Sequence, residues 1–241
     1  MAATTARACE FCGRELRPRV LPSLFGLKPM TLGFEECDCP EARKRREEEE
    51  REEEERRRMA EGEAFCRRLD KAGVPRRYFK AQHPMAKELA DKVEGGASLY
   101  VWGDNGTLKT TLASAIARRL VCHGLRVLMV NSIDLLIEIQ STYGTPKSEA
   151  DVLDRYYKAP VLVIDDLGKE QQTAWTVSRL YSIVNARYGA MLPTVITSNF
   201  KVSDLAERMA GSDQSTARAI ASRLAGSCEQ IATGGGDRRL S

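Results

Sequence analysis

Residues 103–111 read GDNGTLKTT, directly after the apolar run LYVW at residues 99–102. The run predicts a short buried strand, and residues 110–123 carry apolar side chains at helical spacing. A glycine-rich turn between a strand and a helix directs successive backbone N–H groups, and the positive end of the helix dipole, at one point. This stretch therefore predicts a phosphate-binding loop in an α/β fold.

The residue types in this loop suit a nucleoside triphosphate with a magnesium ion. Lys109 is placed to reach the outer phosphates, and the Thr110 hydroxyl is placed to ligate Mg²⁺. Leu108 departs from the usual motif, in which glycine before the lysine lets the backbone approach phosphate closely. An active site, a degenerate and weakly binding one, and a chance turn all stay open. The residues expected to hold ATP are Gly103, Asp104, Asn105, Gly106, Thr107, Leu108, Lys109, Thr110 and Thr111.

A second apolar run, VLVIDD at residues 161–166, ends in two carboxylates. Parallel α/β sheets bind ligands at the carboxyl ends of their strands, so these acids should face the loop. We expect Asp165 to hold Mg²⁺ through water and Asp166 to orient or deprotonate an attacking water. Asn199 ends the next run, TVITSN, and is suited to hold water against the γ-phosphate, unless it only forms a strand-end turn.

Short apolar runs and helical patterns alternate around these motifs, which predicts a mostly parallel sheet covered by helices. Ser132 and Ser148 are expected to cap two of the helices. Strands are expected at residues 99–102, 127–130, 161–165, 194–198 and 230–233. Helices are expected at residues 110–123, 132–140, 148–157 and 173–188.

Two arginine positions near the end of the chain are candidates for contact with phosphate. Arg223, in AIASRL, is a candidate to act on the nucleotide of a neighbouring subunit, or else a surface arginine. GGGDRR offers Arg239, with Arg238 as the other choice, although a frayed basic tail would look the same.

Four of the seven cysteines lie within the first 39 residues, as Cys9, Cys12, Cys37 and Cys39. In a reducing compartment such clustering favours metal, and four thiolates form a tetrahedral site for Zn²⁺. Free thiols and disulfides stay open as alternatives. We expect residues 1–40 to form a small zinc-binding module.

Arginine and glutamate dominate residues 41–70, with glutamates four positions before arginines. This pattern predicts a solvated helical linker, or alternatively a partner-binding arm, because it has almost no apolar stripe. The remaining residues, 71–241, form the predicted α/β domain. No apolar run approaches the ~18 residues that span a bilayer, and the first residues lack a secretory signal, so we expect a cytoplasmic protein without membrane contact.

The motifs GDNGTLKTT, VLVIDDLG, ITSN and SRL, in this order and spacing, resemble those of DnaC/DnaI-type helicase loaders and the related IstB-like transposition ATPases. GVPRRYF at residues 73–79 is also similar to a segment of those proteins, and the resemblance covers about residues 71–241. It implies an AAA+ P-loop NTPase fold, ATP hydrolysis between subunits of a homo-oligomer, single-stranded DNA binding and a replicative DNA helicase as partner. By position it assigns Lys109 and Thr110 to the P-loop, Asp165 and Asp166 to the acidic strand end, Asn199 to a sensor, Arg223 to an arginine finger and Arg239 to a second sensor.

The resemblance also suggests where partners bind. In loaders a helical element before the acidic strand helps to contact single-stranded DNA, and here it comprises residues 132–158. Aromatic and cationic residues there suit base stacking and phosphate neutralisation, although Tyr156 and Tyr157 could pack on the sheet instead. The amino-terminal part of loaders binds the helicase, so the cysteine module is the candidate docking domain. Three functions stay open: a helicase loader, an IstB-like transposition helper ATPase, and a nucleotide-binding-impaired adaptor between helicase and DNA.

Overall fold

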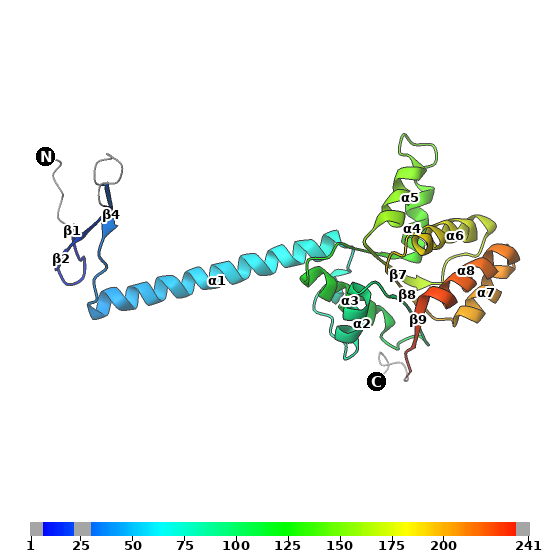
Figure 1. Cartoon of the computed structure of the whole chain (residues 1–241), viewed down its shortest axis with the longest axis horizontal. Helices are drawn as coiled ribbons and strands as arrows, with labels where there is room; N and C mark the ends of the chain where they lie inside the picture. The colour runs from blue at the N-terminus through cyan, green and yellow to red at the C-terminus, as the bar shows by residue number, and fades with distance from the viewer. Residues whose placement is uncertain (1–6, 22–29, 235–241) are drawn as a thin grey trace. The chain divides into compact units, whose positions relative to one another are not determined.

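The structure, a computed structural model, describes residues 7–21 and 30–234 (Figure 1). The chain folds as two compact units, Met1–Glu63 and Ala64–Ser241. Arg238 and Arg239, the candidate sensor arginines, lie outside the described residues. No helix within the described ranges is long and apolar enough to cross a membrane.

The first unit contains two small antiparallel sheets. Strand β1 (Arg7–Ala8) pairs with β2 (Glu15–Leu16), and β3 (Pro18–Leu21) pairs with β4 (Met30–Phe34). Gly13 adopts a positive φ of 72° in the turn after Cys12, a conformation that glycine takes without strain. These short strands bury few side chains, and the cysteines supply most of the small core.

The charged stretch is a helix, α1 (Pro40–Lys71), as predicted. Exposed ion pairs at i,i+4 spacing line it, among them Arg45 with Glu49 at 2.7 Å. Such pairs support an isolated helix that has no apolar face to bury. The carboxyl end of α1 is different, because Leu69 is fully buried and packs with Val74 in the core of the second unit.

The second unit is built on five parallel strands in the order β6-β7-β8-β5-β9. This confirms the predicted α/β fold class. The register places Asn131 opposite Asp165 and Trp102 opposite Ser198, so the polar strand ends gather at one edge. The strands are β5 (Ser98–Trp102), β6 (Val127–Asn131), β7 (Val161–Leu167), β8 (Thr194–Ser198) and β9 (Cys228–Ala232).

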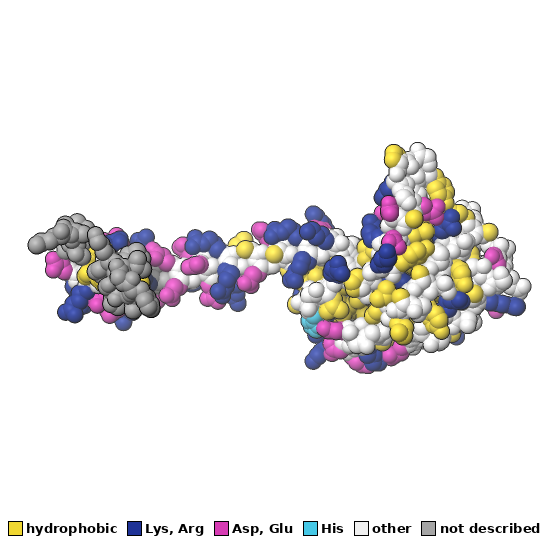
Figure 2. Space-filling view, turned by 45° about the horizontal axis from the view of Figure 1, so that its top comes forward, with side chains coloured by type: hydrophobic (Ala, Val, Ile, Leu, Met, Phe, Trp, Pro, Cys, Tyr) yellow, Lys and Arg dark blue, Asp and Glu magenta, His cyan; other side chains and the backbone are white. Residues whose placement is uncertain are grey.

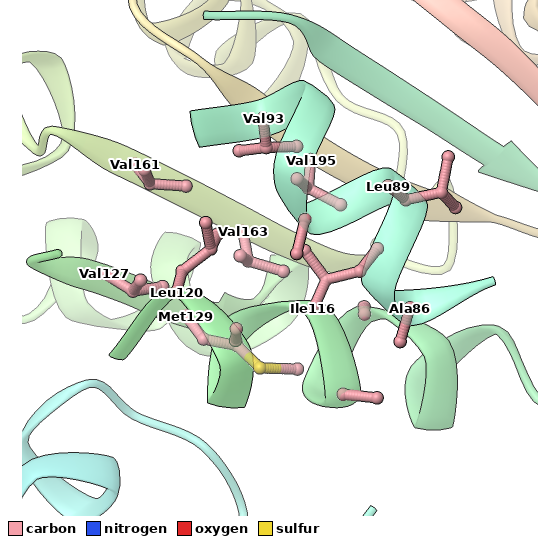
Figure 3. Close-up of a cluster of buried hydrophobic side chains, with 14 of the residues drawn as sticks. Ala86, Leu89, Val93, Ile116, Leu120, Val127, Met129, Val161, Val163 and Val195 are labelled. Carbon is pink, nitrogen blue, oxygen red and sulfur yellow. The ribbon is translucent and has the colours of Figure 1, made fainter. Parts of the chain in front are cut away.

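Helices cover both faces of this sheet. Alternate residues of the strands face opposite sides: Leu99 and Val101 join one buried cluster, and Tyr100 joins the other. The first cluster lies against α2 (Ala86–Glu94) and α3 (Lys109–Cys122), as Figure 3 shows for its labelled members. The second lies against α4 (Ser132–Gln140), α5 (Glu149–Lys158), α6 (Ala174–Gly189), α7 (Val202–Ala210) and α8 (Gln214–Ser227).

One predicted helix cap is wrong, and the other is confirmed in its position only. Asn131, not Ser132, caps α4 by accepting a hydrogen bond from the backbone of Ile133 at 3.0 Å. The Ser132 hydroxyl donates to the Asp166 carbonyl and to Glu170 instead, because it faces the end of β7 and the loop that follows. Ser148 occupies the capping position of α5, but its side chain makes no capping hydrogen bond.

Candidate nucleotide site

The GDNGTLKTT loop joins β5 to α3 and has the backbone shape of a tight cradle. Gly106 has a φ of 80°, and a Cβ on Gly103 would lie 2.3 Å from the Thr233 carbonyl oxygen, so glycine is required there. Leu108 takes the left-handed conformation, with φ 62° and ψ 21°, at the position just before α3. The leucine therefore adopts a backbone conformation that a glycine would adopt at no steric cost.

Lys109 points back across this loop. Its ammonium group donates to the carbonyl oxygens of Gly103 at 2.8 Å and Asp104 at 2.7 Å, which leaves one of its three N–H groups. The side chain is buried, and burial lowers the pKa of the ammonium, although nearby Asp166 opposes this. A buried cation at the mouth of a loop of backbone N–H groups favours an anionic ligand.

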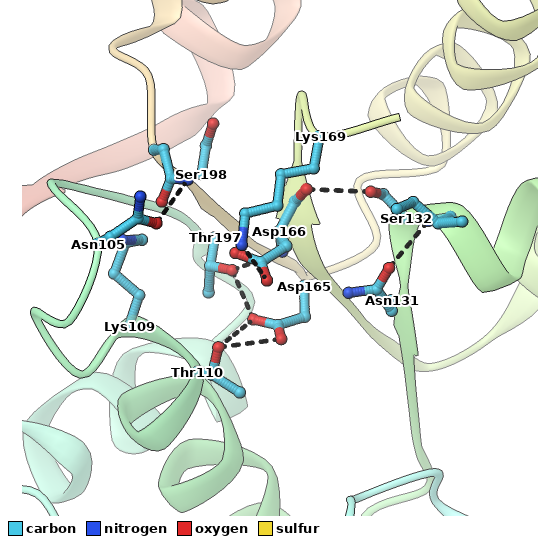
Figure 4. A network of polar contacts seen from close by, with 12 residues as sticks. Asn105, Lys109, Thr110, Asn131, Ser132, Asp165, Asp166, Lys169, Thr197 and Ser198 are labelled. Atoms are coloured by element: carbon cyan, nitrogen blue, oxygen red, sulfur yellow. Dashed lines mark hydrogen bonds and ion pairs between the residues drawn. The ribbon is translucent and has the colours of Figure 1, made fainter. Parts of the chain in front are cut away.

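An oxygen-rich cluster lies beside the lysine (Figure 4). The Asp165 carboxylate accepts hydrogen bonds from the Thr110 hydroxyl at 3.1 Å and from the Thr197 hydroxyl at 2.6 Å. Burial raises the pKa of Asp165, and these two hydrogen bonds work against the rise. A hydroxyl and a carboxylate at this distance are the donor types that Mg²⁺ takes.

Asp166 has an unusual backbone conformation, with a φ of 60°. Its backbone N–H donates to the Thr197 hydroxyl at 2.8 Å, and its carboxylate pairs with Lys169 at 2.9 Å. The two adjacent acids therefore have different partners: Asp165 accepts from the threonine hydroxyls, and Asp166 pairs with Lys169.

Asn199 reaches the nucleotide loop from the end of β8. Its side-chain amide donates to the Asn105 side-chain oxygen at 3.0 Å. Its own side-chain oxygen is buried, and no hydrogen-bond partner for it is found in the part of the chain that the structure describes. Buried polar atoms without a partner are rare, and a water or ligand at this point would satisfy it. The site therefore fits a bound group with a hydrogen-bond donor.

Several residues of this region were not predicted from the sequence. Thr197 links Asp165 to Asp166, and buried Glu170 accepts from Ser132 at 2.8 Å and from the Gly168 backbone. A cleft of about 440 Å³ borders the acids and is also lined by Arg77 and Tyr78 of the GVPRRYF segment. Thr197 stood within the quoted ITSN motif, whereas the position of Glu170 carried no signal.

Arg223 lies apart from this cluster. It projects from α8, and its hydrogen-bond partners are Asn185, Tyr181 and the Ala219 carbonyl, none of which belongs to the nucleotide loop. Lys109, Thr110, Asp165 and Asn199 are therefore brought together in one chain, and Arg223 is not.

The α4–α5 element, the candidate for DNA contact, presents fewer free groups than its composition indicates. Tyr156 is fully buried, so it cannot stack on a base. Arg155 and Lys147 both pair with Glu138. Tyr143 is half exposed; its hydroxyl accepts a hydrogen bond from the Trp175 indole N–H at 2.7 Å, and the two rings lie edge-on with centroids 6.2 Å apart. Hydrophobic and charged side chains mix on the surface of this element in Figure 2.

The four amino-terminal cysteines form a separate cluster within the first unit. Their sulfur atoms all lie within 4.8 Å of one another, with Cys9 and Cys39 3.9 Å apart and Cys12 and Cys37 3.4 Å apart. Tetrahedral zinc with bonds of ~2.3 Å separates its sulfur ligands by about 3.8 Å. Backbone hydrogen bonds from Cys12 and Phe11 lower the pKa of Cys9 to about 7, which favours the thiolate. All seven cysteines are free in this structure.

Comparison with known proteins identifies the family. Residues 78–241 match the model of the IstB-like ATP binding proteins. The replicative helicase loader DnaC of Buchnera aphidicola (subsp. Acyrthosiphon pisum) is 30% identical over 126 residues, which cover 52% of this chain and 50% of the relative. The helicase loader DnaI of Bacillus subtilis is 29% identical over 111 residues, covering 46% of this chain and 35% of the relative. The chain thus matches about half or less of the length of these relatives.

A solved structure extends the likeness to three dimensions. The crystal structure of a DnaI covers 66% of this chain and 94% of its own, with 27% identity and a TM-score of 0.58. The predicted resemblance and the predicted AAA+ fold are both confirmed. The chain belongs to the family of IstB-like ATP binding proteins and is of the DnaC/DnaI type.

Proposed function

We propose that this chain is an ATP-dependent loader of a replicative DNA helicase. One observation carries the proposal: the Thr110 hydroxyl lies 3.1 Å from the Asp165 carboxylate, 55 positions away in the chain, beside the Lys109 ammonium. A P-loop threonine and an acidic strand end that meet in this way suit a magnesium nucleotide.

The proposed roles follow from the side-chain positions. Backbone N–H groups of residues 103–111 bind the phosphates, and Lys109 offers its third N–H to them. Thr110 and Asp165 hold Mg²⁺, which supplies charge neutralisation at the phosphates when it is bound. Asn199 orients the attacking water through its buried side-chain oxygen, and Asp166 accepts the proton once Lys169 releases it.

Further parts of the site involve other molecules. Arg223 contacts the nucleotide of a neighbouring copy, so hydrolysis needs a homo-oligomer. Arg239 makes a second contact to the nucleotide. Single-stranded DNA binds along α4–α5, where the half-exposed ring of Tyr143, packed on the partly buried Trp175 of α6, takes the place of the buried Tyr156. The replicative helicase binds the cysteine module.

We also propose that the three predicted segments have separate tasks. Residues 1–40 dock the helicase and hold Zn²⁺ on Cys9, Cys12, Cys37 and Cys39. Residues 41–70 connect this module to the ATPase domain of residues 71–241. The support is the spacing of the sulfur atoms, the ion-paired surface of α1, and the family match, which starts at residue 78.

The test combines helicase binding with hydrolysis. The full chain is mixed with the replicative helicase of its own organism and passed through a sizing column with Mg-ATP. We expect a complex, and ATP turnover that Lys109→Ala abolishes. No complex, together with turnover, would favour the transposition helper; a complex without turnover would favour the adaptor with impaired nucleotide binding. Neither complex nor turnover would overturn the proposal.

A further inference from the structure

The guanidinium of Arg223 is held in a fixed position by side chains of another helix. Its Nε donates to the Asn185 side-chain oxygen at 2.9 Å, and one Nη donates to the Tyr181 hydroxyl at 3.2 Å. The other Nη donates to the Ala219 carbonyl at 3.1 Å. The rings of Tyr181 and Tyr188, 4.9 Å and 5.9 Å from the central carbon, contact the cation. Three residues of α6 thus fix one arginine of α8.

These contacts leave two N–H groups of the guanidinium available for a further ligand. A guanidinium has five N–H groups, and the three hydrogen bonds leave one on each terminal nitrogen. Two such groups form the fork that binds a phosphate or carboxylate with two parallel hydrogen bonds. Within residues 7–21 and 30–234, no carboxylate lies at salt-bridge distance from Arg223, so neutral groups alone hold its charge. An arginine that served only to join α6 to α8 would not need this arrangement.

The packing of the two helices has a separate basis. Leu180 and Val184 of α6, and Ile220 and Leu224 of α8, are buried in the same hydrophobic cluster. Apolar burial of this kind holds the helices together without the polar contacts to Arg223. The Tyr181 hydroxyl and the Asn185 amide are therefore free to serve another purpose.

We infer that Tyr181 and Asn185 are positioning residues, which hold the Arg223 guanidinium ready for the phosphates of a neighbouring copy. The inference rests on the proposed function of Arg223. Tyr188, which is half exposed, places its ring centroid 5.9 Å from the central carbon of the guanidinium. A flexible arginine would have to be ordered each time a neighbour docked, whereas this one is ordered in advance.

The test measures whether Arg223 of one chain supports hydrolysis of the ATP bound by another chain. One full-length variant, Arg223→Ala, keeps its nucleotide site but cannot supply the arginine. A second, Lys109→Ala, supplies the arginine but cannot hydrolyse ATP. Their mixture should recover hydrolysis that neither has alone. The positioning variants are then added to the Lys109→Ala chain, so that they never alter the site whose turnover is measured.

We expect Tyr181→Phe or Asn185→Ala in the donor chain to lower the kcat of the mixture about tenfold, the loss expected for one hydrogen bond to a charged group, with KM unchanged. Tyr157→Phe is the matched control. The Tyr157 hydroxyl donates to the Ser182 hydroxyl of α6, the helix that also carries Tyr181 and Asn185, at 3.1 Å and is not among the partners of Arg223. It should leave kcat unchanged. Thermal midpoints of all donor chains should agree, which excludes misfolding.

The outcomes separate the two claims. If the starting mixture recovers nothing, or if Arg223→Ala in the donor leaves recovery intact, the arginine does not act in trans, and this part of the proposed function fails together with the inference. If Arg223→Ala in the donor abolishes recovery while Tyr181→Phe and Asn185→Ala leave kcat intact, only the inference is overturned. An equal loss with Tyr157→Phe would also overturn it, since the effect would then be structural.

Discussion

The nucleotide loop contains a leucine in a backbone conformation that favours glycine, and replacing it is the sharpest single test of the site. Leu108 has φ 62° and ψ 21°. Its side chain is half-buried and belongs to neither hydrophobic cluster of the second unit. Leu108→Gly therefore removes backbone strain at little cost in packing.

The size of the effect follows from this conformation. The left-handed conformation destabilises the folded state by roughly 1–2 kcal/mol for a residue other than glycine. Glycine removes this strain, but the greater freedom of its unfolded chain lowers the stability by about 0.5–1 kcal/mol. A net gain of about 0.5–1 kcal/mol raises the thermal midpoint of a domain this size by about 1–4 °C. Strain that is present in the free protein raises the midpoint when it is removed, whereas strain that arises only when ATP holds the loop in this shape appears in the affinity. ATP binding should therefore tighten by up to about fivefold to the extent that the free loop relaxes.

The assay is calorimetric titration of ATP with Mg²⁺, together with thermal unfolding. Met191→Gly is the matched control, since Met191 also has a positive φ, 51°, and is 86% exposed in the turn after α6. It should raise the midpoint by a similar amount and leave ATP affinity unchanged. Unchanged or weaker ATP affinity in Leu108→Gly would refute the reasoning, because the leucine would then contribute to binding or the strain would not oppose it.

Three further outcomes are expected. Asp165→Asn should raise the thermal midpoint at pH 7 in magnesium-free buffer: burial raises the pKa of Asp165, so the stability that its protonated form provides is lost as the pH rises through the folded pKa. This gain should shrink towards about pH 4, near the ordinary value of 3.8, and a pH-independent gain would contradict it. Arg187→Met should lower the free energy of unfolding in urea by about 3–5 kcal/mol, because buried Arg187 donates to the Ala159 carbonyl at 2.8 Å and to other carbonyls, which would lose their partner. A loss below about 1 kcal/mol would contradict this. Purified chain should contain zinc at about one equivalent, and Cys12→Ser but not Cys66→Ser should lose most of it; equal zinc content in both variants would argue against the four-cysteine site.

Local patterns were sufficient to predict the sheet and the nucleotide loop. Strands buried on both faces leave continuous apolar runs, so β7 could be predicted from VLVIDD with its acids at the right edge. Helix α7 was not predicted, although Val202, Leu205 and Met209 are buried at helical spacing. The long extent of α8 was also missed, since small residues weaken its apolar stripe.

Contacts between distant residues could not be predicted. Thr197 meets Asp165 across 32 positions, and Glu170 meets Ser132 across 38, because the sheet order brings their strands together. Tyr156 was a candidate for base stacking on composition alone, but its burial depends on how α5 packs. The left-handed backbone of Leu108 is likewise invisible in the sequence, which indicates only that a glycine is missing.

The central claim is that the loop at residues 103–111 and the acids after β7 form one magnesium nucleotide site. A crystal structure of the full chain with Mg²⁺ and a non-hydrolysable ATP analogue tests it most directly. The account predicts phosphates inside the loop, Lys109 against the outer phosphates, and the metal between Thr110 and Asp165. A Leu108 side chain in the phosphate position, or a nucleotide bound away from Asp165, would contradict it.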